Sequence, residues 1–457
     1  MSLGSPSHIR RAALLALLGG AAGLLACRHL GRSPSPPPSA DTVLWSGAVT
    51  PTSARMHARV PGGDTAGVRL AVTDGDWAEA TIHEGTAPDD NPAVLQVALD
   101  DLTPDTRYRY ALQVDGRIDT ARSGRFRTFG DGPFSFRVAM GACATTGSTH
   151  PVFDAIRGTN PDLFLHLGDM HYEDIAATRP GPFRRAYRQV HGSTPQAALY
   201  RSTPLAYVWD DHDYGPNNSS RRAPGQALAQ QVYREYVPHY PLAEPEDAPI
   251  YQAFTVGRVR FLLTDLRSAR TRNRAPDSVK TMMGARQKRW FKRQLRRARD
   301  RYPVIAWVSS VPWIGPEGAS EDHWGGFARE RRELATYVDS IGVNDQLVML
   351  SGEAHMVALD DGTHNHFGRD DGGGFPVVHA ASLDQTGSVK GGPYSHGPYR
   401  TPLTLFGRRP GQFVVMDVED DGGDEVCVSW TGKRYDPGRD RLSTLLEWDT
   451  CFPVPSP

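Results

Sequence analysis

The residues best suited to chemistry in this sequence lie in the segment Gly168-Asp169-Met170-His171-Tyr172. A pair of metal ions promotes the hydrolysis of a phosphate ester because the ions activate water and hold the ester oxygens. Such a pair needs a carboxylate that both ions share, and Asp169 is suited to that role. Tyr172 follows three residues later, where its phenolate can bind one ion. The segment therefore predicts a metal centre built around Asp169.

Side chains that could bind a metal ion or a phosphate follow four other apolar segments of the chain. Cys143 follows residues 134–140, Asp211 and His212 follow 205–209, Asp265 and Arg267 follow 261–264, and Glu353 and His355 follow 347–350. Asp169 itself follows the apolar segment 163–167. In α/β folds, ligands bind beyond the carboxyl ends of the strands. If the five segments are strands of that kind, their endings meet in one site.

The elements around these endings support an α/β fold. From residue 131 onward the pattern runs strand, loop, helix, with predicted helices at 151–157 and 284–299 and a further strand at 304–308. The second helix is basic and amphipathic, which indicates a solvated outer face. No internal repeat and no nucleotide-binding glycine fingerprint is found in the sequence. We therefore predict a catalytic domain over residues 131–457.

Residues 42–130 follow a different pattern. Short alternating segments at 55–60, 68–72 and 93–97 are separated by turn residues, which is typical of a β-sandwich. The segment 102–116, with Tyr108 before an apolar strand, looks like the late strands of a fibronectin type III domain. This part of the chain carries no evident chemistry.

The first 27 residues are predicted to be a signal peptide. Residues 12–26 are apolar and follow Arg10-Arg11, and Leu24-Leu25-Ala26-Cys27 ends them like a bacterial lipobox, whose cysteine becomes lipidated. An ordinary signal peptide with a chance cysteine is the alternative, and the paired arginines also permit twin-arginine export. Residues 28–41 form a Pro/Ser-rich linker. We expect an exported protein, in the periplasm or at the cell surface, anchored to the membrane through lipid on Cys27.

The balance of charged residues limits the classes of function that this protein can have. The formal net charge of the 457 residues is −1 and 39% of them are hydrophobic, so no nucleic-acid-binding surface is evident and phosphate chemistry must rely on local charge.

Besides Cys27 the chain has Cys143, Cys427 and Cys451. A disulfide between Cys427 and Cys451 would pin the C-terminus and leave Cys143 unpaired.

The spacing Gly-Asp-x-x-Tyr resembles the signature of purple acid phosphatases and, more closely, of the PhoD-like alkaline phosphatases among the metallophosphoesterases. The resemblance extends over residues 141–144, 150–156, 209–214, 264–267, 324–331 and 351–355. It implies a metallophosphoesterase-type αββα sandwich preceded by a β-sandwich. The expected substrate is a phosphate ester.

The same resemblance implies Fe³⁺ held by Cys143, Asp169, Tyr172 and His355, with Ca²⁺ facing Asp169, Asp211 and Glu353. Thiolate, phenolate and imidazole suit a transition metal, whereas carboxylates suit Ca²⁺. Other divalent metal ions could occupy the same site. The chain departs from the family where Glu353 replaces a common aspartate, where His171 lies within the signature, and where a middle-strand histidine is missing.

Three residues are candidates for catalysis. His212 would protonate the leaving alcohol or stabilise the transition state, with Asp213 as an orienting partner. Arg267 would clamp a phosphate oxygen, with Asp265 beside it, although these two could instead form a structural ion pair.

His364, His366 and His379 could reach the site on a loop or be surface residues. Trp313, Trp324 and Phe327 line its mouth or pack beneath it.

These observations predict an alkaline phosphatase D-like hydrolase of phosphomonoesters or phosphodiesters that uses metal-activated water. An alternative from another class is a surface lipoprotein that binds phosphate or calcium without turnover. A dinuclear-metal enzyme acting on a sulfate ester or a cyclic nucleotide is a third reading. The oligomeric state is not indicated.

Overall fold

The computed structural model describes residues 42–60, 65–244, 249–318, 322–369, 372–388, 390–398 and 409–456. The predicted signal peptide, the lipid attachment at Cys27 and the linker 28–41 lie outside these residues. Within the described part of the chain no helix is long and apolar enough to cross a membrane.

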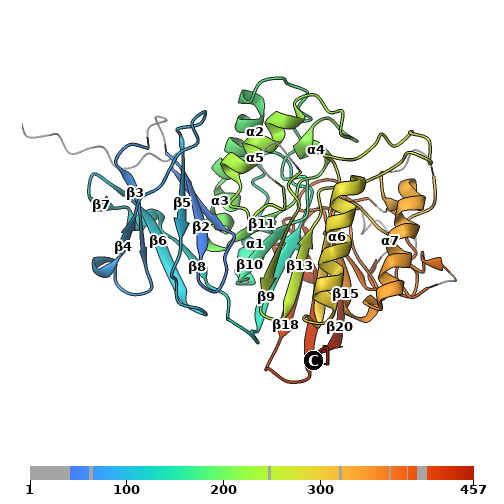
Figure 1. Ribbon diagram of the computed structural model, residues 1–457. Coiled ribbons are helices and arrows are strands. Elements are labelled where there is room, and N and C mark those ends of the chain that lie inside the picture. Colours follow the sequence, from blue (N-terminus) through green and yellow to red (C-terminus); the bar gives the residue numbers. More distant parts are fainter. Residues whose placement is uncertain are drawn as a thin grey trace, which may run out of the picture. The chain divides into compact units, whose positions relative to one another are not determined.

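One sheet combines strands from the beginning, middle and end of the chain, in the order β20-β19-β18-β9-β10-β11-β1-β2-β5 (Figure 1). These strands are β1 (Val43–Gly47), β2 (Ala54–Arg59), β5 (Val94–Leu99), β9 (Phe136–Gly141), β10 (Leu163–His166), β11 (Leu205–Tyr207), β18 (Gln412–Glu419), β19 (Glu425–Asp436) and β20 (Arg441–Pro453). β9, β10 and β11 are parallel, so their carboxyl ends lie at one edge.

A second sheet has the order β12-β13-β14-β15-β17-β16. Its strands are β12 (Gln252–Val256), β13 (Val259–Leu263), β14 (Val304–Ser309), β15 (Leu347–Ser351), β16 (Val357–Asp360) and β17 (Val377–Ala380). β13, β14, β15 and β17 are parallel. Every residue of β14 and β15 is buried, as expected for parallel strands covered on both faces.

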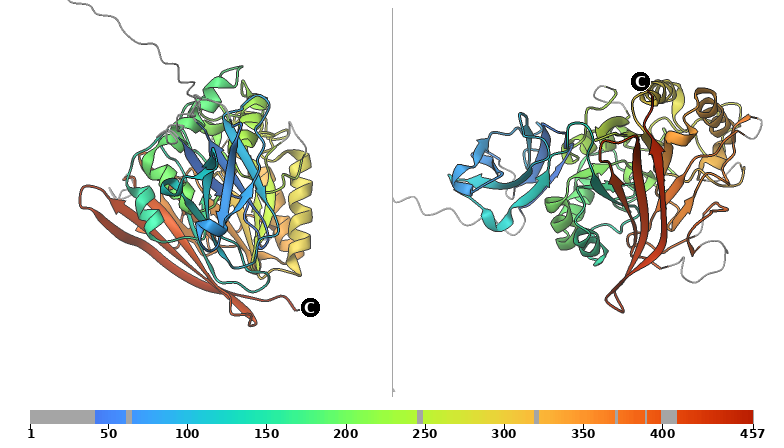
Figure 2. Two further views of the ribbon diagram at one scale, coloured as in Figure 1. Left: turned by 90° about the vertical axis from the view of Figure 1, so that its left-hand side faces the viewer. Right: turned by 90° about the horizontal axis from the view of Figure 1, so that it is seen from below.

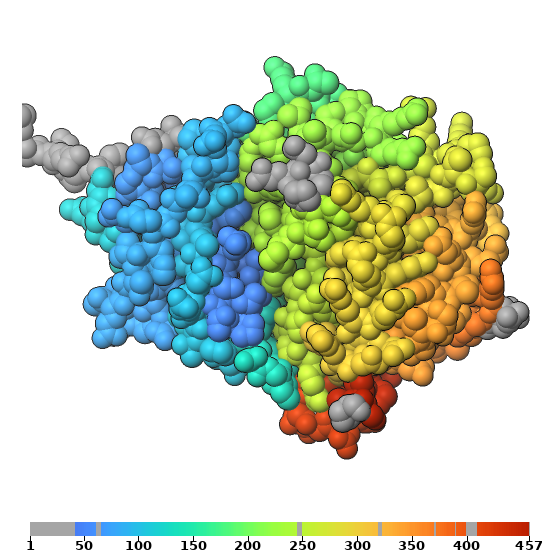
Figure 3. All heavy atoms as spheres, viewed as in Figure 1, coloured from blue at the N-terminus to red at the C-terminus, as the bar shows by residue number. Residues whose placement is uncertain are grey.

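Helices cover the outer faces of both sheets. The helices are α1 (Val152–Gly158), α2 (Gly181–Gly192), α3 (Thr194–Ser202), α4 (Asp211–Tyr214), α5 (Gln226–Tyr236), α6 (Gly284–Arg299) and α7 (Ala328–Ile341), with short 3₁₀ turns η1 (Trp77–Glu79), η2 (Thr120–Arg122), η3 (Trp324–Phe327) and η4 (Asn344–Gln346). α6 and α7 form much of the surface seen in Figure 3 (yellow and orange).

Alternate side chains of each strand enter different cores, as the two-residue period of a strand requires. In β10, Leu163 and Leu165 face the core between the sheets, whereas Phe164 packs with α1, α2, α3 and α5. In β14, Trp307 packs with α6 and α7, and Ala306 faces the core between the sheets. The order of layers is therefore helices, sheet, sheet, helices.

The N-terminal strands are joined to the larger sheet. β3 (Val68–Thr73), β4 (Thr81–His83), β6 (Arg107–Val114), β7 (Arg117–Ile118) and β8 (Gly124–Arg127) form a separate sheet. Its apolar side chains share a core with those of β2 and β5. β1 pairs in parallel with β11 at Gly47 and Leu205, and all described residues belong to one compact unit. A domain boundary at residue 130 stays a prediction.

Several predictions about elements are confirmed. The five strands expected before the candidate residues are β9, β10, β11, β13 and β15, and the basic helix predicted at 284–299 is α6. Cys427 and Cys451 lie opposite each other on β19 and β20 and form a disulfide. Among the described cysteines, Cys143 is the free thiol, and it is buried. Figure 2 shows β18 to β20 as a long C-terminal ribbon (red).

A buried ion pair holds α2, α5 and the segment before β5 together. The two carboxylate oxygens of Glu235 accept from Nη2 and Nε of Arg184 at 2.6 and 2.7 Å. Asn91 Nδ2 also donates to Glu235, at 2.8 Å. Glu235 is 4% exposed, so loss of its charge leaves a guanidinium in a poorly solvated place.

We predict that Glu235→Gln lowers the free energy of unfolding by ~3 kcal/mol, because a buried ion pair loses one partner. The control is Glu84→Gln, since Glu84 pairs with Arg69 where both side chains are largely exposed, and such pairs contribute ~0.5 kcal/mol. Denaturant unfolding of the two variants measures the difference. Equal losses in both would contradict the role assigned to Glu235.

Candidate metal centre

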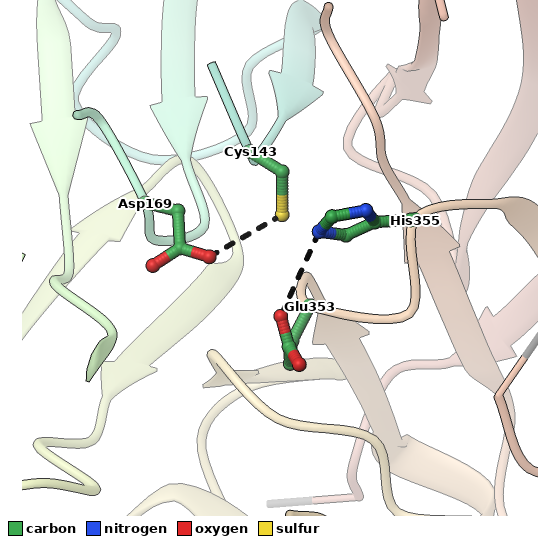
Figure 4. Close-up of side chains that lie close together, drawn as sticks. All are labelled: Cys143, Asp169, Glu353 and His355. Atoms are coloured by element: carbon green, nitrogen blue, oxygen red, sulfur yellow. Dashed lines mark hydrogen bonds and ion pairs between the residues drawn. The ribbon is translucent and has the colours of Figure 1, made fainter. Parts of the chain in front are cut away.

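Four side chains from three strand ends converge on one point. Cys143 follows β9, Asp169 follows β10, and Glu353 and His355 follow β15. One ligand atom from each lies within 4.8 Å of the others. Figure 4 shows the thiol, the two carboxylates and the imidazole directed toward a common space. The predicted meeting of these strand endings is confirmed for this group.

Tyr172 completes one side of the cluster. Its hydroxyl lies 2.9 Å from Asp169 Oδ2 and 3.0 Å from His355 Nε2. Cys143 Sγ lies 3.6 Å from the same oxygen of Asp169, and His355 Nε2 lies 3.8 Å from Glu353 Oε2. Sulfur, phenol and imidazole donors are therefore gathered on one side of Asp169.

The backbone at these residues is strained. Cys143, Asp169, Glu353 and His355 have φ angles of 63°, 53°, 55° and 53°. This left-handed conformation is unfavourable for residues with a Cβ atom and is concentrated at functional sites in proteins. It turns each side chain inward immediately after its strand ends.

A second, carboxylate-rich group lies on the other side of Asp169. Ligand oxygens of Asp169, Asp210, Asp211 and Glu353 lie within 4.8 Å of one another. Asp169 Oδ1, Asp210 Oδ2 and Asp211 Oδ1 are buried, and none of them has a hydrogen-bond partner among the described residues. Buried oxygens of this kind are costly unless a cation or a donor satisfies them. The donor set therefore fits a metal ion.

The electrostatics of the cluster lead to the same conclusion. Burial, together with the charges of Asp211 and Asp210, raises the pKa of Asp169 well above its ordinary value. Burial is also the main cause that raises the pKa of Glu353 to about 8. The pKa of the Cys143 thiol and that of the Tyr172 phenol are raised by burial and by the Asp169 carboxylate. A bound cation reverses this situation, because it stabilises the deprotonated forms.

His355 is oriented as a ligand. Its Nδ1 lies 2.8 Å from the carbonyl oxygen of Thr386, which can only accept a hydrogen bond. Nδ1 therefore carries the proton, and the lone pair of Nε2 faces the cluster. A metal-binding histidine is fixed by such a contact on its other nitrogen.

His212 lies beside the cluster, where it was predicted, but with a different orienting partner. One of its nitrogens lies within 4.8 Å of oxygens of Asp169 and Asp211, and its ring stacks on Tyr172 with centroids 4.0 Å apart. Its Nδ1 contacts Asp174 Oδ1 at 2.8 Å. The prediction that Asp213 orients His212 is wrong. The carboxylate of Asp213 accepts hydrogen bonds from the backbone N–H groups of Asp210 and His171 instead.

Arg267 is part of the cluster's support and does not face an open space. Its side chain is fully buried, and its guanidinium contacts Asp210 at 2.5 Å, Asp322 at 3.1 Å and Asp211 at 3.5 Å. Three carboxylates thus occupy the donors that a phosphate would need. Arg267 therefore positions Asp210 and Asp211 and does not make the expected contact with phosphate.

Asp265 is a structural residue in this fold, which corrects its assignment to catalysis. Its oxygens accept from the indole of Trp209 and the backbone N–H of Ile250, each at 3.0 Å, and also from Ser268. The side chain is buried and belongs to none of the metal-binding groups among the described residues. These bonds anchor the end of β13 to the end of β11.

The remaining candidates are also placed. His364 contacts Asp360 at 2.6 Å, His366 contacts the carbonyl oxygen of Gly372 at 3.0 Å, and His379 is buried on β17. None of the three belongs to a metal-binding group of the described residues. Trp313, Trp324 and Phe327 are buried in the core that α6 and α7 form on the second sheet, so they do not line the mouth of the site.

Sequence reasoning missed Asp174, Asp322 and Lys390. The ammonium of Lys390 contacts Glu353, and it reaches the cluster from a loop well beyond β15. Such loop residues have no periodicity or spacing that predicts them. Asp210, by contrast, belongs to the four ionisable residues 210–213 that follow an apolar strand and thereby indicate a site.

The layered fold and its cluster at the strand ends have counterparts among solved structures. A structure of PhoD matches with a TM-score of 0.71 and 17% identity, covering 91% of each chain. A purple acid phosphatase, PPD1 from yellow lupin (Lupinus luteus) seeds, matches with a TM-score of 0.57 and 14% identity, covering 90% of this chain and 73% of the other. The protein thus has a mixed α/β fold similar to that of both phosphatases.

The family follows from the sequence itself. The PhoD-like phosphatase model matches residues 138–389, and the chain belongs to this family. That range contains every residue of the cluster, from Cys143 to His355. No curated protein sequence matches the chain significantly.

We predict that Asp169→Asn weakens metal binding by at least ~100-fold, because its carboxylate is shared by both ligand groups. Elemental analysis after dialysis, followed by titration calorimetry, measures the loss. The control is Asp277→Asn, which removes an 85% exposed carboxylate from a surface loop and leaves metal content unchanged. Wild-type metal content in Asp169→Asn would show that the ions bind elsewhere.

Proposed function

We propose that this protein hydrolyses phosphomonoesters or phosphodiesters at a centre of two unlike metal ions. The observation that supports it is the cluster itself: Cys143, Asp169 and His355 converge with buried carboxylate oxygens that have no hydrogen-bond partner among the described residues, at the ends of parallel strands. Membership of the PhoD-like phosphatase family supports metal-dependent hydrolysis of a phosphate ester as the reaction class.

The two sides of the cluster favour different ions. Cys143, Tyr172 and His355 would hold Fe³⁺, and Asp211 with Glu353 would face Ca²⁺, while Asp169 is shared. When bound, the ions supply positive charge that activates water and neutralises the phosphate oxygens. A thiolate and a phenolate on one ion also give a coloured protein if that ion is ferric.

The chain's own residues carry the remaining steps. His212 would donate the proton that the leaving alcohol needs, with Asp174 holding its ring in position. Arg267 neutralises Asp210 and holds Asp211 toward the shared space. Lys390 contacts Glu353 and offsets part of the negative charge there.

The N-terminal regions belong to the same proposal. Residues 42–130 would form a fibronectin III-like β-sandwich, and the hydrogen bond from Thr103 N to the Tyr108 hydroxyl supports this reading. Export and lipid attachment at Cys27 rest on the sequence pattern of residues 10–27 alone. The enzyme would thus meet its substrates outside the cytoplasm.

Hydrolysis of an aryl phosphate and of the corresponding bis-aryl ester tests the function. The metal-loaded protein is expected to hydrolyse at least one of them, and Asp169→Asn or prior treatment with a chelator is expected to lower kcat/KM by at least ~1000-fold, the order of effect from losing metal activation and charge stabilisation. Binding of phosphate or calcium without hydrolysis of either ester would favour a non-catalytic binding protein. Hydrolysis of a sulfate ester or cyclic nucleotide alone would change the substrate class.

The role of His212 predicts a dependence on the leaving group. His212→Gln should lower kcat for alkyl phosphates by ~100-fold and for nitrophenyl phosphate far less, because nitrophenolate leaves without a proton. Asp174→Asn should show the same pattern more weakly, with unchanged metal content. The control is Asp277→Asn. A uniform loss across all leaving groups would contradict proton donation by His212.

A further inference from the structure

We propose that a pocket beside the metal centre binds a second phosphate group of the substrate. The pocket has a volume of about 370 Å³ and is lined by Arg221, Arg222, Arg272 and Arg274, together with Ser220 and Thr271. We call it the arginine pocket. The inference rests on the proposed function, because it concerns the part of a phosphate ester that does not react.

The arginine pocket is formed by two loops. One connects α4 to α5 and carries Arg221 and Arg222, and the other connects β13 to α6 and carries Arg272 and Arg274. The backbone N–H of Arg221 donates to the carbonyl of Arg270 at 2.9 Å, which joins the loops directly. Asn273 Nδ2 donates to Asn218 Oδ1 at 3.2 Å and joins them a second time. The two loops that carry the four arginines are thus held together by specific contacts.

The same loops contact the metal centre. The backbone N–H of Asn218, three residues before Arg221, donates to Asp211 Oδ2 at 2.6 Å. On the other loop, Arg270 shares the carboxylate of Asp322 with Arg267, which in turn contacts Asp211. The loops that form the arginine pocket are therefore bonded to residues of the carboxylate cluster.

The charges of the arginine pocket are not balanced by any carboxylate that the structure describes. Arg221, Arg222, Arg272 and Arg274 are exposed, and none forms an ion pair with a described residue. The described residues that line the pocket include no carboxylate. Arg267 and Arg270, only a few residues away in the chain, are both paired with Asp322. Since the whole chain has a net charge of −1, this local excess is not a consequence of a basic protein.

Four like charges in one pocket repel each other, and an anion relieves that repulsion. Guanidinium groups bind carboxylate and phosphate oxygens through paired hydrogen bonds, and the higher charge of a phosphate suits a set of four arginines better. The reacting phosphate occupies the metal centre. The arginine pocket therefore selects esters in which a second phosphate is attached to the same molecule.

Paired inhibitors test the proposal. Alkanediol bisphosphates of increasing chain length are compared with the monophosphates of the same alkanediols, as competitive inhibitors of aryl phosphate hydrolysis. At the best length the bisphosphate should bind ~10-fold more tightly than the monophosphate, the effect expected of two partly exposed ion pairs. The advantage should shrink as salt concentration rises.

The double variant Arg222→Gln/Arg272→Gln should lose the bisphosphate advantage and keep both its affinity for the monophosphate and its aryl phosphate turnover. The matched control is Arg296→Gln/Arg297→Gln, which removes the same charge from the exposed last turn of α6. Arg221→Gln/Arg274→Gln serves as a second test if the first variant folds poorly.

Equal binding of bisphosphate and monophosphate by the wild-type protein would overturn the proposal. An advantage that survives in both arginine-pocket variants would also overturn it, because the second phosphate would then bind elsewhere. Titration calorimetry of the same compounds separates this question from catalysis. If no ester is hydrolysed but the bisphosphate advantage is present and depends on these arginines, the binding site stands and the proposed enzyme function fails.

Discussion

Mutual repulsion among buried carboxylates is the interaction on which the rest of the site depends. Asp169, Asp210, Asp211 and Glu353 approach one another closely in a place with little water. Arg267 and Lys390 offset part of this charge from two sides, yet buried oxygens without hydrogen bonds remain. Bound cations would offset the remaining charge, and membership of the PhoD-like phosphatase family supports metal-dependent hydrolysis by an independent route.

The fold supplies the rigidity that such repulsion demands. Parallel strands in the two sheets end at the cluster, and fully buried side chains fix each strand from both faces. Asp265 contributes from outside the cluster by tying β13 to Trp209, just before Asp210. The loops that contact Asp211 also form the arginine pocket, so the proposed phosphate-binding pocket and the carboxylate cluster are connected through a few backbone hydrogen bonds.

Local patterns in the sequence were enough to predict the strands, the basic helix and the residues of the cluster, because each ligand directly follows an apolar segment. What the sequence could not provide is the pairing of distant side chains. Arg267 looked suited to phosphate until Asp210, Asp211 and Asp322 were seen to occupy its donors. Asp174 and Lys390 come from loops, where neither periodicity nor spacing identifies a functional residue, and only the folded chain brings them to His212 and Glu353.

The left-handed backbone at Cys143, Asp169, Glu353 and His355 limits how this centre can evolve. In the proposed centre, each of these positions must suit both a metal ion and a conformation that costs ~1–2 kcal/mol for most side chains. Among residues with a Cβ atom, aspartate, asparagine and histidine tolerate that conformation best, whereas β-branched residues tolerate it least. Exchange of one ligand type for another is therefore restricted by the main chain before metal chemistry is considered, and new metal preferences would arise more readily from the surrounding loops.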